Sequence, residues 1–178
     1  LNAMKLDVST FGNHEHDRDI NHLVKMINLS DFAWVASNYS TLAPMNTGAK
    51  KVKSYVIIER GGVKIGVVGA NTSETPDVVY PGNMAGMSIS PDPKYLNSAI
   101  ADAKAAGAQI VVALVHQGWA ENKGGIATGE LTFTYPRLKG ATVVFGGHSH
   151  LLYSTISANN RWSPAVTVGQ VPNSGVGY

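Results

Sequence analysis

Three short polar segments carry residue types that hold metal ions, and each directly follows an apolar run. They are residues 12–17 (Gly-Asn-His-Glu-His-Asp), 116–118 (His-Gln-Gly) and 148–150 (His-Ser-His). Asn13, His116 and His148 offer one amide oxygen and two imidazole nitrogens, which suit a borderline divalent ion such as zinc, manganese or iron. His150 would point to the opposite side of an extended loop, where it could reach a second ion.

Each of these signals also has a purely structural reading. A histidine after a strand is commonly a hydrogen-bonded residue without a metal, and short His-x-His pairs arise by chance. Asn13 and His14 after a glycine can be ordinary turn chemistry. Ligands of open α/β sheets bind beyond the carboxyl ends of strands, so three such positions in one chain together favour a metal site.

The elements that must position these residues alternate between strands and helices. The hydrophobic pattern predicts strands at 8–11, 32–39, 53–59, 63–68, 110–115, 141–145 and 166–171, and helices at 20–29 and 93–106. Gly61 and Gly62 predict a hairpin between the third and fourth strands. Loops are expected after Gly69 and at 118–129. The alternation indicates an α/β domain, and the apolar run at 110–115 predicts a strand covered on both faces.

Residues 65–71 (Ile-Gly-Val-Val-Gly-Ala-Asn) resemble the start of a dinucleotide-binding turn. That turn requires Gly-x-Gly-x-x-Gly opening directly into a helix, so that the backbone can approach a pyrophosphate. Here the glycine spacing differs and residues 72–76 do not predict a helix. A packed strand with small residues is the better interpretation.

Composition excludes several classes of protein. The 178 residues are 44% hydrophobic, which is enough for one domain with a sizeable core. Only 15% are charged, the net charge is +2 and no basic run occurs, so we expect no nucleic-acid surface. No apolar run reaches the roughly 20 residues of a membrane span. With no cysteine, any metal must be held by His, Asn or carboxylates.

The blocks Gly-Asn-His-Glu-x-Asp at 12–17 and Gly-Gly-His-Ser-His at 146–150 resemble the signature of the calcineurin-like metallophosphoesterases. Further matches favour the branch of 5′-nucleotidases and 2′,3′-cyclic-nucleotide 2′-phosphodiesterases. They are the lead-in at 2–7, Ala-Ser-Asn at 36–38 and the hairpin strand at 64–69. The resemblance runs from residue 1 to about residue 169, and we therefore take residues 2–7 as native sequence.

The resemblance implies an α/β fold, a four-layer α-β-β-α sandwich. Residues 1–178 would form part of one catalytic domain, incomplete at the N-terminus. The implied reaction is hydrolysis of a small phosphate ester or nucleotide with two divalent ions (Mn, Zn or Fe). Asn13, His116 and His148 would bind one ion and His150 the other, while His14 would contact the phosphate or protonate the leaving group. Asp17 would orient His14, and secretion, the periplasm or the cell wall is the implied location.

The sequence also departs from the family pattern. The family carries Asp-x-His and Gly-Asp-x-x-Asp upstream of the Asn-His block, and neither occurs in these 178 residues, nor does the branch's C-terminal nucleotide-binding domain. His16 stands where nucleotidases usually carry an aromatic residue. We therefore expect weak activity or none from these residues alone, and a sheet edge open to association with another chain. The alternative is a catalytically incomplete module that binds at most one metal and acts structurally or through a partner.

Overall fold

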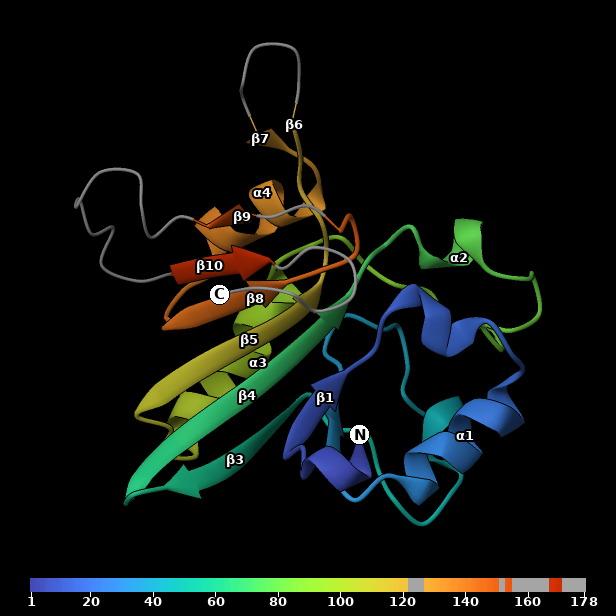
Figure 1. The fold of residues 1–178 in the computed structure, drawn as a ribbon, viewed down its shortest axis with the longest axis horizontal. Helices are drawn as coiled ribbons and strands as arrows, with labels where there is room; N and C mark the ends of the chain where they lie inside the picture. Colours follow the sequence, from blue (N-terminus) through green and yellow to red (C-terminus); the bar gives the residue numbers. More distant parts are fainter. Residues whose placement is uncertain (122–126, 151–152, 155–166, 171–178) are drawn as a thin grey trace.

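The structure, a computed structural model, describes residues 1–121, 127–150, 153–154 and 167–170 (Figure 1). The strands are β1 (Val8–Thr10), β2 (Ala33–Val35), β3 (Tyr55–Arg60), β4 (Val63–Asn71), β5 (Ile110–His116), β6 (Ala120–Glu121), β7 (Ala127–Thr128), β8 (Val143–Gly146), β9 (Tyr153–Ser154) and β10 (Thr167–Gln170). The α-helices are α1 (Ile20–Leu29), α2 (Thr75–Val78), α3 (Lys94–Ala105) and α4 (Glu130–Thr134). Short 3-10 turns are η1 (Asn2–Met4), η2 (Asn13–His16), η3 (Pro44–Asn46) and η4 (Tyr135–Arg137).

Most strands belong to one mixed sheet with the order β3-β4-β5-β8-β10-β9. Its centre, β4-β5-β8-β10, is parallel, and an antiparallel strand closes each side. A separate parallel pair, β1-β2, joins Val8 to Ala33 and Thr10 to Val35. In the described part of the chain, β1 pairs with β2 alone and its other edge faces no strand.

The layers are held by three apolar clusters. On one face of the large sheet, Leu96, Ile100 and Ala103 of α3 pack against β4, β5 and β8. The other face meets the β1-β2 pair. Beyond that pair, Leu23 and Ile27 of α1 cover an aromatic cluster that lies over β1 and β2. The order α3, large sheet, β1-β2, α1 is the expected four-layer α-β-β-α arrangement, visible in Figure 1.

Several elements lie where the sequence predicts them. The helix at 20–29 is confirmed; the carboxylate of Asp19 caps it by accepting from the amide of His22 at 2.9 Å. The hairpin is also confirmed, with φ of 57° at Gly61 and 77° at Gly62. No helix among the described residues is long and apolar enough to cross a membrane.

Other boundaries differ from the prediction. The strand expected at 32–39 pairs with β1 only over Ala33–Val35, because the amides of Ala36 and Ser37 turn to the carbonyls of Lys53 and Gly69. The loop expected after Gly69 begins later, since β4 continues to Asn71 alongside β5. The loop expected at 118–129 contains β6 and β7. The helices α2 and α4 and the strand β9 are not expected from the sequence.

The glycines of β4 serve close packing, as expected for a strand rather than a dinucleotide-binding turn. A Cβ at Gly69 would lie 2.4 Å from the carbonyl oxygen of Val35, and one at Gly66 would lie 2.9 Å from the Cβ atoms of Ala103 and Ala108. The two sheets can therefore approach each other, and α3 can lie directly on β4, only because these positions lack side chains.

The strand β5 is only partly as expected. Val111, Ala113 and Val115 are buried on its α3 side, whereas Val112 and Leu114 on the opposite side are half-buried. The β1-β2 pair covers that second face incompletely among the described residues.

Candidate metal centre

The three polar segments meet where three strands end. β5 ends at His116, and its neighbour β8 ends at Gly146, just before His148. The third segment follows β1, which belongs to the other sheet. The strand ends therefore converge as expected, but across two packed sheets rather than along the edge of one.

Asn13 and His116 are in direct contact. The Nε2 atom of His116 lies 2.9 Å from Oδ1 of Asn13, a distance that allows a hydrogen bond. Two ligands at right angles on one ion, each about 2.1 Å from it, would also lie about 3 Å apart. The spacing of these two atoms therefore fits neighbouring ligands of a single metal ion.

His148 completes this group. The rings of His116 and His148 lie 5.0 Å apart between centroids, with an interplanar angle of 61°. Burial, together with positive charge on His148, His14 and His150, lowers the pKa of His116 to about 4. His116 is thus kept neutral, the form in which imidazole binds metals.

The close approach of the first loop to His116 depends on Gly12. A Cβ at this position would lie 2.8 Å from Cε1 of His116, closer than side-chain atoms pack. The loop is also tied locally, because the amide of Gly12 donates to the Glu15 carboxylate at 2.6 Å. Glycine at this position lets Asn13 reach the histidine ring.

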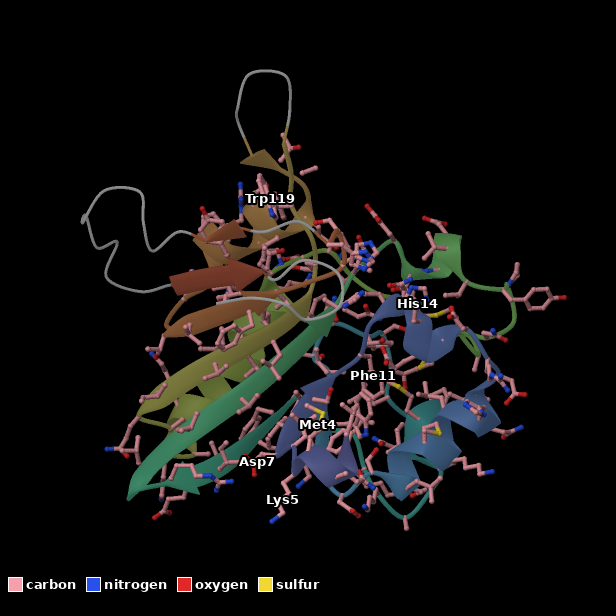
Figure 2. All side chains as sticks on the ribbon, viewed as in Figure 1. Met4, Lys5, Asp7, Phe11, His14 and Trp119 are labelled. Carbon is pink, nitrogen blue, oxygen red and sulfur yellow. The ribbon has the colours of Figure 1, made fainter. Side chains whose placement is uncertain are left out.

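His14 faces solvent on the same loop (Figure 2). Its Nδ1 atom lies 2.8 Å from the carboxylate of Asp17, and both side chains are more than half exposed. A carboxylate can only accept here, so Nδ1 carries a proton and Nε2 is left to face a ligand. The pairing of these two residues is the one expected from the sequence.

His16 takes part in a buried polar chain instead of the metal centre. Its Nε2 atom lies 2.8 Å from the Tyr39 hydroxyl, which accepts a hydrogen bond from the side-chain amide of Asn71, also at 2.8 Å. His16 and Asn71 are fully buried. His16, which replaces the usual aromatic residue, therefore lies in the core beside the rings of Phe11 and Tyr39.

The loop after β8 is not extended, contrary to the assumption that placed His150 opposite His148. Both residues have left-handed backbone conformations, with φ of 74° and 57°. The loop is anchored by a hydrogen bond from the amide of Gly147 to the carbonyl of Gln117, at 3.1 Å. His150 is exposed, and its charge still opposes protonation of His116.

One carboxylate at the site is not among the residues expected from the sequence. Oε2 of Glu74, at the start of α2, lies 3.1 Å from Nε2 of His148. Glu74 follows the end of β4, the strand next to β5, so its position after a strand end was the available signal. Because 74 residues separate Glu74 from His148, their pairing could not be predicted from the sequence and is seen only in the tertiary structure.

The donor set fits one divalent ion. Asn13, His116 and His148 supply one oxygen and two nitrogens at adjoining positions. The described residues contain no group of three or more His, Cys, Asp or Glu that could hold a metal. A second ion would need ligands besides His150. A hollow of about 620 Å³ beside α1 is lined by His14 and Asp17 but by none of the three donors, so we do not assign it to a substrate.

Comparison with protein families matches residues 2–152 to the calcineurin-like phosphoesterases, and the chain belongs to this family. Among curated proteins, it is similar to a 5′-nucleotidase of Bos taurus, with 26% identity over 97% of this chain and 28% of the relative. It is also similar to Protein 5NUC of Lutzomyia longipalpis, with 27% identity over 92% of this chain and 27% of the relative. The chain thus spans little more than a quarter of the length of these relatives.

Solved structures agree on the fold. A 5′-nucleotidase precursor from Thermus thermophilus superposes with a TM-score of 0.73 at 24% identity, covering 96% of this chain and 34% of the other. The calcineurin-like phosphoesterase YfkN from Bacillus subtilis gives a TM-score of 0.70 at 26% identity, covering 94% of this chain and 55% of the other. The similarity to curated 5′-nucleotidases supports the 5′-nucleotidase branch, as the sequence blocks indicate.

Proposed function

We propose that the protein is a metal-dependent hydrolase of phosphate esters, with nucleotides as the favoured substrates. The observation that carries the proposal is the contact of Asn13 with His116, next to His148, at the junction of the two sheets. Membership of the calcineurin-like phosphoesterases supports the reaction type, and similarity to proteins named 5′-nucleotidases supports the substrate class.

In this proposal Asn13, His116 and His148 hold one of two divalent ions (Mn, Zn or Fe), and His150 contributes to the second. Bound ions of this kind polarise a phosphoryl oxygen and lower the pKa of water. His116 enters the site as the neutral ligand, because burial disfavours its charged form.

His14 is the proposed proton donor to the leaving oxygen. Its Nδ1 hydrogen bond to Asp17 holds the ring and leaves Nε2 available to the ester. Exposure of both side chains lets a small substrate reach Nε2 without rearrangement of the core. Asp17 acts through His14 by holding its tautomer and by stabilising its positive charge before the proton is transferred.

The test measures hydrolysis of p-nitrophenyl phosphate, AMP and 2′,3′-cyclic AMP by the purified protein as its gene encodes it, with and without a chelator. We expect hydrolysis to depend on metal and His14→Ala to lower kcat by about 10²–10⁴-fold. His22→Ala is the matched control, since this half-buried histidine of α1 is not among the donors. Metal-independent hydrolysis, or full activity of His14→Ala, would overturn the proposal.

A second candidate is a catalytically incomplete module that binds at most one ion. The absence of a group of three His, Cys, Asp or Glu among the described residues favours it. Elemental analysis after dialysis separates the two candidates. Two metal equivalents per chain support the hydrolase with its second ion; one or fewer, together with no hydrolysis, supports the module.

Location and association complete the proposal. Several similar proteins are named snake venom 5′-nucleotidases, which supports export of this protein as well. The outer edge of β1, unpaired among the described residues, is the sheet edge through which another chain could associate. Cell fractionation tests export, and analytical ultracentrifugation tests association with another chain.

A further inference from the structure

Glu74 lies on a firmly held turn between β4 and α2. Thr72 and Thr75 on either side are fully buried, and the hydroxyl of Thr75 donates to the carbonyl of Thr72 at 2.9 Å. The amide of Ser73 donates to the Glu130 carboxylate at 3.0 Å, and the amide of Glu74 donates to the Thr72 hydroxyl at 3.2 Å. The backbone of Glu74 is therefore fixed relative to the sheet, although its side chain is 64% exposed.

His148 lies on the loop that follows β8, opposite this turn. The residue has a left-handed φ of 74°, and its imidazole is about one-fifth exposed. The ring contacts His116 edge-on and meets the Glu74 carboxylate at 3.1 Å through Nε2. Glu74 thus supplies the hydrogen-bonding partner that fixes the orientation of the ring.

The chemistry of this contact selects a tautomer. A carboxylate accepts hydrogen bonds and cannot donate, so Nε2 of His148 must carry the proton. The lone pair is then on Nδ1, and only a nitrogen with a free lone pair can bind a metal. Carboxylates that accept from the second nitrogen of a ligand histidine fix its orientation and raise its basicity.

We propose that Glu74 is a positioning residue that holds His148 in the Nδ1-ligand tautomer. This inference rests on the proposed role of His148 as a metal ligand. It adds a carboxylate from the β4–α2 turn to a site otherwise built from the ends of β1, β5 and β8.

The test compares Glu74→Ala, Glu74→Gln and Asp77→Asn. Asp77 is an exposed acid on the same short helix, so its change removes an equal charge without touching His148. Titration calorimetry with Mn²⁺ should show about 10–100-fold weaker binding for Glu74→Ala. Glu74→Gln should fall in between, because its amide oxygen still accepts, and Asp77→Asn should stay within about twofold of wild type.

A second readout needs neither metal nor activity. Nitrogen-15 NMR of the metal-free protein should show His148 protonated on Nε2 in the wild type and a mixture of tautomers in Glu74→Ala. The inference is overturned if wild-type His148 is protonated on Nδ1, or if Glu74→Ala binds Mn²⁺ like wild type while His148→Ala does not. If His148→Ala also binds like wild type, the ligand assignment in the proposed function fails instead.

Discussion

The two loops that bring ligands to the site are built in opposite ways. The first, residues 12–17, is part of the core: Phe11 before it and His16 within it are fully buried, and Asn13 is 7% exposed. The second, residues 146–150, is half-buried up to Ser149 and exposed at His150, and it has left-handed backbones at both histidines. The first loop's geometry therefore depends on buried side chains of its own, whereas the second loop is held by hydrogen bonds and by close packing of Gly146 on Leu131. Substitutions in the first should cost stability, and those in the second should cost mainly metal binding.

The largest effect is expected from Phe11→Ala. This ring is fully buried and stacks on Trp34 with centroids 4.5 Å apart, so its removal leaves a cavity beneath the first loop. We expect a loss of about 3–5 kcal/mol in the free energy of unfolding, measured in urea. Phe133→Ala is the control, because Phe133 is 47% exposed, and it should cost less than about 1 kcal/mol. Equal losses in the two variants would mean that the buried ring of Phe11 contributes no more to stability than the exposed ring of Phe133.

The buried chain behind the first loop should show coupling. Tyr39→Phe removes the partner of His16 and of Asn71 at once, and we expect it to cost about 1–3 kcal/mol. In a His16→Phe background the same change should cost less, because only Asn71 then loses a partner. A double-mutant cycle measures this difference, expected to be at least about 0.5 kcal/mol. Strict additivity would mean that the hydroxyl and the imidazole do not stabilise each other.

Part of the pH dependence of stability should also come from the first loop. Burial lowers the pKa of His16 to about 4, an effect that the negative charge of Asp17 only partly offsets. The unfolded chain takes up this proton near pH 6.5, so stability should fall as pH drops from about 6.5 to about 4. The slope from one such group is at most about 1.4 kcal/mol per pH unit.

Urea denaturation of the metal-free protein across this range should give a smaller slope for His16→Phe. Part of the slope should remain, because burial also lowers the pKa of His116. His22→Ala on the half-buried face of α1 is the control and should keep the wild-type profile. An unchanged slope in His16→Phe would mean that His16 can be charged in the folded protein.

The smallest effect is expected in the second loop. His150 is exposed and has φ of 57°, a conformation that glycine adopts without strain and alanine does not. The free energy of unfolding of His150→Gly should therefore exceed that of His150→Ala by up to about 1 kcal/mol. Both variants lack the imidazole. A stability loss of several kcal/mol in either variant would show that this loop is as much part of the fold as the first.

Much of the fold follows from local sequence. The helix at 20–29 follows from an apolar face that repeats with helical period and from the Asp19 cap, and the hairpin from two adjacent glycines. The early end of β2 could not be predicted. The amides of Ala36 and Ser37 bond to Lys53 and Gly69, and those partners are set by how the two sheets pack.

The sequence by itself determined which residue types are at the strand ends, and so the positions at which a metal site could form. It also indicated the family, because the two blocks at 12–17 and 146–150 are local. The tertiary structure decided which of these side chains meet. It placed His16 in the core beside Tyr39, gave His148 a left-handed backbone and brought Glu74 to its ring. These contacts join residues 23 and 74 positions apart, and only the packing of two sheets and their turns specifies such distances.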